Sequence, residues 1–202
     1  MASETDICNM ALGLIGDKRI EKYGDDDLPR GKYCKLFYPQ ARDEVLVSSG
    51  VEWRCAWSRK GPLAAVTDQP TFGWDYAYQV PTNPVCLRIL GLVDGEDSND
   101  ELLEVEWKRE GDYILTNEDE CYVLYVSQME DSGKFPPLLV QAIQYNLAAK
   151  LSIPISGGDR QLHRDLLEEY ERLVLPDAIS ANNAEGYVKD EKGEASWIEA
   201  GR

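Results

Sequence analysis

The chain has 202 residues, of which 37 are acidic and 21 are basic, so its formal net charge is −16. This length suits one domain with a substantial core, or a helical and a β lobe that share an interface. The charge excludes tight DNA binding by the general surface, because such binding depends on clustered Lys and Arg that release counterions.

The first third of the chain predicts two helices. Residues 3–6 (SETD) resemble a capping box, and a first helix should run from there to about Gly16. Pro29 suits the first position of a longer helix that ends near Ser48, with a bend at Pro39. Residues expected on the inward faces are Ile7, Met10, Ala11 and Leu14 in the first helix and Tyr33, Phe37, Ala41 and Val45 in the second.

Five aromatic residues follow as candidate contact residues. Trp53 and Trp57 could form a ligand platform, but such large rings are more typical of core anchors. Trp74, Tyr76 and Tyr78 are spaced by two, so an extended chain would project all of them from one face. We expect these three rings to clamp the helical body to a β layer, with any exposed ring acting as a subunit contact.

The middle of the chain predicts a small antiparallel sheet. Strands are expected at 86–92, 102–109, 113–115 and 121–127, separated by turn-rich stretches. The acidic stretch 94–101 hints at calcium, but its glycine spacing does not match a calcium loop. An exposed hairpin tip is the favoured interpretation, and no metal or cofactor site is predicted.

Two further helices are expected near the C-terminus. Pro136 and Pro137 open the first, which Pro154 should stop, and Asp159 caps the second. Residues expected inward are Leu138, Leu139, Ala142, Ile143, Leu147 and Leu151 in the first, and Leu162, Leu166, Tyr170 and Leu173 in the second.

Residues 177–202 contain few apolar side chains until Trp197 and Ile198. Such a segment cannot bury enough apolar surface to order itself, so we expect an extended arm that docks on a partner. Trp197 and Ile198 would be its apolar anchor, with Arg202 adding polar contacts at the rim.

These elements predict an α+β fold. A bundle of about four helices (1–57 and 136–176) carries an inserted β region (58–135), followed by the arm (177–202). The five cysteines lack a CxxC pair, which disfavours zinc and favours reduced thiols. Neither a secretion signal nor a bilayer-length apolar run is recognisable, so we expect a soluble protein made in a reducing cytosol.

Catalytic motifs of the common hydrolase, nucleotide-binding and zinc-protease types are absent from the sequence. The single histidine, His163, lies one residue from an apolar helical row, which favours a boundary imidazole over a catalytic base. Carboxylate pairs are expected by chance in so acidic a chain, so they nominate no acid and base. A non-enzymatic role is expected.

The whole chain resembles the head-to-tail adaptor (connector) proteins of tailed phages, often labelled tail tubular protein A. The resemblance is carried by the order and spacing of seven segments. They are 7–16 (ICNMALGLIG), 38–46 (YPQARDEVL), 53–56 (WRCA), 73–81 (GWDYAYQVP), 86–88 (CLR), 142–151 (AIQYNLAAKL) and 196–202 (SWIEAGR).

This resemblance implies a virion protein of the tail or neck that is made in the host cytoplasm. It implies a ring of identical subunits, dodecameric in this family, between the portal protein and the tail nozzle, without membrane contact. DNA would pass through the lumen unbound, and acidic walls would let it slide. Two alternatives stay open: a monomeric acidic binding or assembly module, and a carboxylate-dependent hydrolase.

Overall fold

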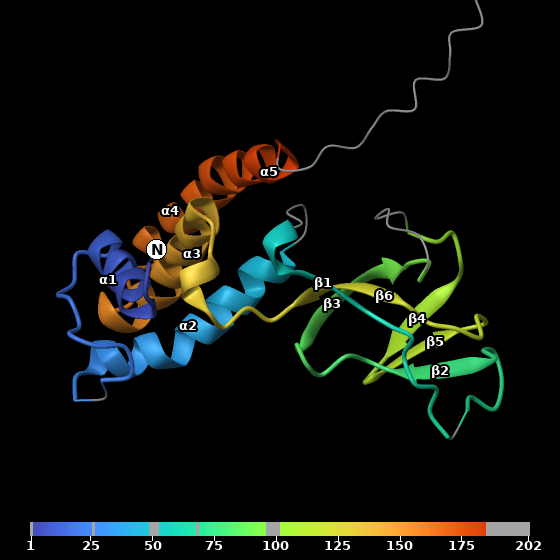
Figure 1. Cartoon of the computed structure of the whole chain (residues 1–202). Helices are drawn as coiled ribbons and strands as arrows, with labels where there is room; N and C mark the ends of the chain where they lie inside the picture. The colour runs from blue at the N-terminus through green and yellow to red at the C-terminus, as the bar shows by residue number, and fades with distance from the viewer. Residues whose placement is uncertain (1, 26, 49–52, 68, 96–101, 185–202) are drawn as a thin grey trace, which may run out of the picture.

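The computed structural model describes residues 2–25, 27–48, 53–67, 69–95 and 102–184. It confirms the α+β class: helices from both ends of the chain form a bundle, and the strands lie between them in sequence. In Figure 1 the bundle stands at one side and the β region at the other, with α2 and the strands β1 and β6 leading from one to the other.

The helices of the first half begin and end close to the predicted residues. Helix α1 spans Glu4–Leu14, and the Ser3 hydroxyl and the Asp6 carboxylate form the expected capping box. Helix α2 spans Pro29–Val47, with Pro39 accommodated inside it. The prediction that Met10 faces inward is wrong: its side chain is 36% exposed, whereas Cys8 and Leu12 are fully buried.

Side chains of α1 hold the connection that follows it. The Asn9 amide donates to the Ile20 carbonyl at 3.1 Å and accepts from the Ile20 N–H at 2.8 Å. One turn earlier, the Thr5 hydroxyl accepts from the Tyr23 N–H at 3.0 Å. Because backbone groups need such partners away from regular structure, these bonds fix the path from α1 to α2.

Helix α3 spans Pro137–Ile155 and is the centre of the bundle, since α1, α2 and α4 all pack on it. Its predicted apolar face is confirmed by Leu139, Ile143, Leu147 and Leu151, which are fully buried. The sequence predicted that this helix ends at Pro154, and it ends one residue later, at Ile155. A proline in the last turn removes one backbone donor without breaking the turns before it.

Helix α4 (Arg160–Glu169) begins at the predicted cap, where an Asp159 carboxylate oxygen accepts from two backbone N–H groups. It continues through the π-helical turn η3 (Tyr170–Val174) into α5 (Leu175–Ala184). The arm predicted from residue 177 therefore begins no earlier than 185. Residues 185–202 lie outside the described part of the chain.

The π turn also overturns one predicted inward residue. Buried residues along this helix recur every four positions, as Leu166, Tyr170, Val174 and Ala178. A regular α-helix has 3.6 residues per turn, so a four-residue spacing drifts around its axis, and the wider π turn offsets that drift. As a result Val174 points inward, and Leu173, predicted inward, is 63% exposed.

The β region contains two three-stranded antiparallel sheets where the sequence predicted one. Their orders are β1-β6-β3 and β2-β5-β4. The strands are β1 (Trp57–Lys60), β2 (Tyr76–Gln79), β3 (Cys86–Leu92), β4 (Trp107–Glu110), β5 (Tyr113–Thr116) and β6 (Val123–Ser127).

The strand predicted at 102–109 is shorter because its chain crosses between the sheets. Leu102 still pairs with Val93 beside the end of β3, whereas Trp107 pairs with Thr116 on β5. Residues 103–106 lie between those two pairings and belong to no strand. The other three predicted strands are confirmed to within two residues.

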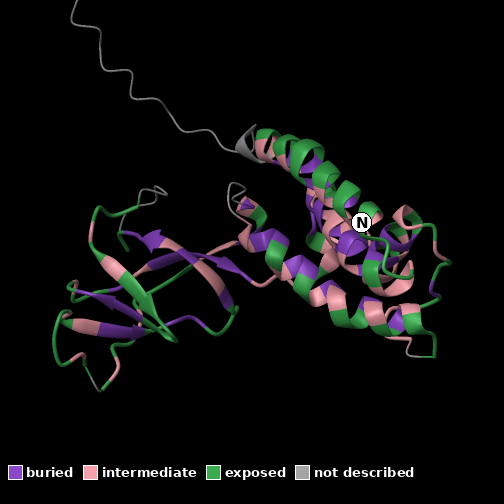
Figure 2. Ribbon diagram, turned by 180° about the vertical axis from the view of Figure 1, so that it is seen from behind, coloured by how far each residue is buried: buried purple, intermediate pink, exposed green. Residues whose placement is uncertain are grey.

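Strand β6 belongs to both cores of the molecule, and all five of its residues are buried (Figure 2). Val126 packs in the helical core, whereas its neighbour Tyr125 packs in a second core between the two sheets. Alternate residues of a strand face opposite sides, so one strand contributes to both cores. The sheet β1-β6-β3 is thus the middle layer between the bundle and the outer sheet.

Candidate functional site

Trp53 and Trp57 lie where the bundle meets the middle sheet. Trp53 is 2% exposed, and its indole N–H donates to the Val45 carbonyl at 3.0 Å, which confirms the core-anchor interpretation. Trp57 is half-buried at the start of β1, and the Arg54 guanidinium lies 5.5 Å from its ring centroid. A cation over an aromatic face is attracted by the ring quadrupole, so this pair is a local contact of the chain itself.

The clamp of Trp74, Tyr76 and Tyr78 does not lie between bundle and sheet as predicted. Tyr78 is 1% exposed in the core between the two sheets, and Tyr76 packs beside it with ring centroids 6.3 Å apart. The Tyr78 hydroxyl donates to the Glu118 carbonyl at 2.9 Å, and burial raises the pKa of Tyr78 to about 12. The spacing of two is confirmed as a strand for Tyr76 and Tyr78 only, and that strand, β2, pairs with β5 rather than packing on the helices.

Trp74 precedes β2 and is half-buried. It is absent from both core clusters of the described residues. The structure therefore separates the five predicted aromatic residues into Trp53 and Trp57 beside the bundle, Tyr76 and Tyr78 in the core between the sheets, and Trp74 outside both cores. Trp197, Ile198 and Arg202 lie outside the described residues, and so does most of the acidic stretch 94–101.

His163 is a boundary residue, as predicted. Its Nδ1 lies 2.7 Å from the Ala149 carbonyl, so this nitrogen carries the proton and donates. The Ser152 hydroxyl donates to the same carbonyl at 2.7 Å. The imidazole thus fastens α4 to α3, which is a structural role.

No group of three or more His, Cys, Asp or Glu side chains in the described ranges is placed to hold a metal ion. Four cysteines are buried and Cys55 is exposed, and none of the five forms a disulfide. Burial raises the pKa of Cys121 to about 11, which keeps that thiol protonated and unreactive at neutral pH.

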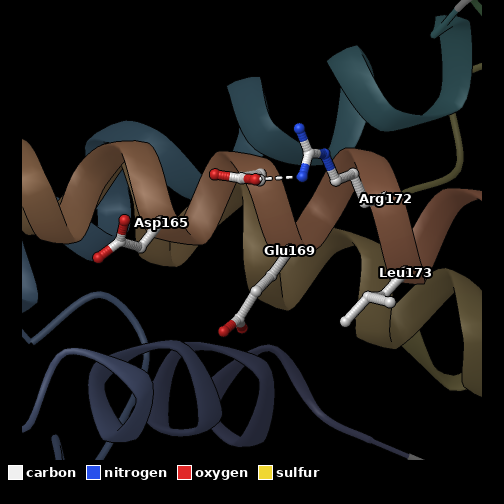
Figure 3. Close-up of a pocket in the computed structure, with 5 residues that line it drawn as sticks. Asp165, Glu169, Arg172 and Leu173 are labelled. Atoms are coloured by element: carbon white, nitrogen blue, oxygen red, sulfur yellow. Dashed lines mark ion pairs between the residues drawn. The ribbon is translucent and has the colours of Figure 1, made fainter.

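A shallow groove of about 300 Å³ runs along the outer side of α4 and η3 (Figure 3). Asp165, Glu169 and Leu173 follow one another at a spacing of four, and the three side chains project from the same side of the helix (Figure 3). Glu168 pairs with Arg172 at 2.5 Å on the flank. The groove therefore has an apolar end at Leu173 and an acidic edge that favours a cationic partner.

A second exposed stripe lies on α2, on the side away from its buried residues. It consists of Lys32, Leu36 and Gln40 on α2 together with Leu28, the residue just before the helix, and all are exposed, Leu36 at 54%. Elsewhere on the surface, the loop before β2 carries Phe72, which is 87% exposed. None of these residues was predicted from the sequence to be a contact residue. The sequence signal that could have found the stripe is Leu36, an apolar residue on the side of α2 opposite Cys34, Tyr38 and Val45.

No described helix is both long enough and apolar enough to cross a membrane. Comparison with known proteins adds no relative: no protein-family model matches the chain, and no curated protein matches it.

Proposed function

We propose that this chain is a head-to-tail adaptor of a tailed phage. It is a structural virion protein without enzymatic activity, and it forms a dodecameric ring that joins the portal protein to the tail nozzle. The ring is part of the DNA channel for genome retention and ejection, and DNA passes through it without specific binding. The net charge of −16 supports this last point, because an acidic wall repels the phosphate backbone.

The observation that carries the proposal is where the resembling segments lie. Segments 7–16 and 142–151 lie in α1 and α3, segment 38–46 lies in α2, and residues 53–56 adjoin the junction with the middle sheet. Together they contribute a large share of the buried side chains of the helical core. A likeness that coincides with the packed framework of a chain supports a shared architecture more strongly than scattered surface matches.

The junction supports a rigid body that could bear load between two larger assemblies. The Gln128 amide donates to Asp43 at 2.7 Å, and the Ser127 hydroxyl donates to the Ala56 carbonyl at 2.9 Å. Asp43 also accepts from the Arg42 guanidinium at 2.8 Å. The Gln128 bond joins the end of β6 to α2, the Ser127 bond joins β6 to the residue before β1, and the Arg42 bond holds the Asp43 carboxylate in place, so the junction is fastened by hydrogen bonds as well as by packing.

Light scattering coupled to size exclusion tests the proposal, with the chain alone and with the portal protein of the same phage. We expect a portal-bound ring containing many copies of the chain. A chain that stays monomeric alone is compatible with assembly on the portal, but a monomer that also ignores the portal contradicts the proposal and favours a monomeric binding module. Metal-dependent turnover at a defined acidic pair would instead favour a hydrolase.

The arm belongs to the same proposal. We expect residues 185–202 to grip the portal or a neighbouring subunit through Trp197, Ile198 and Arg202, and a ring of weak grips gains strength by avidity. A chain truncated after Ala184 should keep its fold and lose stable attachment to heads that contain the portal. Full attachment of that truncated chain would contradict a docking arm.

A further inference from the structure

We propose that the stripe on α2 and the groove on α4–η3 are the two halves of one subunit contact, each meeting the other on a neighbouring copy. The stripe consists of Leu28, Lys32, Leu36 and Gln40, and the groove is lined by Asp165, Glu168, Glu169, Arg172 and Leu173. This inference rests on the proposed ring and names the surfaces that build it.

The two surfaces match in shape. On each helix the exposed side chains recur every four residues, and rows of that spacing form the ridges and grooves by which helices pack on one another. Leu36 and Leu173 are the two most exposed leucines among the described residues, at 54% and 63%. Each is a large apolar side chain left in water in the free chain, and contact between them would remove both from it.

The two surfaces also match in charge. Lys32 lies one turn before Leu36, whereas Asp165 and Glu169 lie two turns and one turn before Leu173. With a net charge of −16, two copies repel each other in general, so a contact that places a lysine against carboxylates is favoured over one that places carboxylates together. A second copy of this chain supplies both surfaces, which is why it is the occupant we assign.

The placement of the surfaces suits a ring. Helices α2 and α4 both pack on α3, and the stripe and the groove are two different surfaces of the subunit. Two different surfaces that meet each other on neighbouring copies make head-to-tail contacts, and these close into a ring when the rotation between copies allows it. A contact between two identical patches would stop at a dimer instead.

Disulfide trapping tests the pairing in a Cys55→Ser background, which removes the exposed native thiol. Chains carrying Leu36→Cys are mixed with chains carrying Leu173→Cys under mild oxidation, and the double variant is oxidised alone. We expect dimers from the mixture, a ladder of higher oligomers from the double variant, and no disulfide dimer from either single variant. Both oxidations are carried out with the portal protein present, because the chain alone can stay monomeric. Homodimers from a single variant, or no dimer in the mixture with the portal present, would overturn the assignment.

A charge reversal provides a second measurement. Lys32→Glu should lower the yield of mixed dimers by about two- to fivefold, the size of one exposed ion pair. The matched control Lys18→Glu makes the same charge change at an exposed position outside both surfaces and should leave the yield unchanged. An equal loss in both variants would show that net charge alone governs the association.

These outcomes are separable from those of the adaptor proposal. Rings that assemble on the portal without the Leu36–Leu173 cross-link would overturn the surfaces and leave the adaptor function standing. Cross-linked ladders in a chain that ignores the portal would support the surfaces and contradict the adaptor function.

Discussion

Two glycine-to-alanine substitutions should change stability in opposite directions. Gly13 lies in α1, and a Cβ added there has nothing within 4 Å. Gly31 lies in the first turns of α2, and a Cβ added there would overlap the backbone carbonyl of Asp25. The chemical change is the same, so the difference between the two variants isolates the effect of that close approach.

The expected magnitudes follow from two opposing contributions. Alanine in place of glycine inside a helix stabilises by about 0.5–1 kcal/mol, which is the expected gain for Gly13→Ala. At Gly31 the same gain is opposed by an overlap with backbone, and such overpacking typically costs about 1–3 kcal/mol. Gly31→Ala should therefore be destabilising by about 1–2 kcal/mol.

Thermal unfolding followed by circular dichroism measures both variants beside the parent chain. For a chain of this size, about 1 kcal/mol shifts Tm by about 2–4 °C, so the two variants should lie on opposite sides of the parent. A Gly31→Ala variant as stable as Gly13→Ala would refute the close approach of the loop to α2.

Three other predictions concern the helix end, the thiols and a buried tyrosine. Truncation after Pro176 removes the fully buried Ala178 and the half-buried Ile179, so it should lower the free energy of unfolding by about 2 kcal/mol. Truncation after Ala184 should leave Tm unchanged. Equal Tm values for the two truncated chains would argue against a packed α5. A thiol reagent should modify only Cys55 in the folded chain and the four buried cysteines after unfolding; a second fast thiol would contradict their burial. The pKa of Tyr78 is raised to about 12 from an ordinary value near 10, so the folded chain holds this proton more tightly than the unfolded chain. The stability that this shift confers is complete below about pH 10 and is lost as pH rises towards 12. Urea unfolding of Tyr78→Phe should therefore show a smaller decrease in the free energy of unfolding between pH 10 and pH 12 than the parent chain shows. An equal decrease in both chains would count against the assignment.

Local signals predicted the helix starts well because each rests on nearby atoms. The Ser3 capping box, the Pro29 start and the Asp159 cap all involve residues within one turn of each other. Strand β3 was likewise found with its full extent from residue alternation alone.

The misplaced features depend on contacts between distant parts of the chain. Leu173 faces outward because η3 keeps Val174 and Ala178 against α3, and helical spacing alone does not show a π turn. Tyr78 packs between two sheets because β2 pairs with β5, more than thirty residues away in sequence. The groove on α4–η3 was missed for the same reason, since its apolar end is the leucine that the regular spacing had assigned to the core.

The position of β6 has a consequence for how the molecule opens. Val126 and Tyr125 are adjacent in the chain, yet one completes the helical core and the other completes the core between the sheets. Detaching either half would uncover one side of this strand and weaken its hold on the other half. The two halves should therefore unfold as one cooperative unit, and the backbone amides of β6 should be among the last to exchange with solvent deuterium.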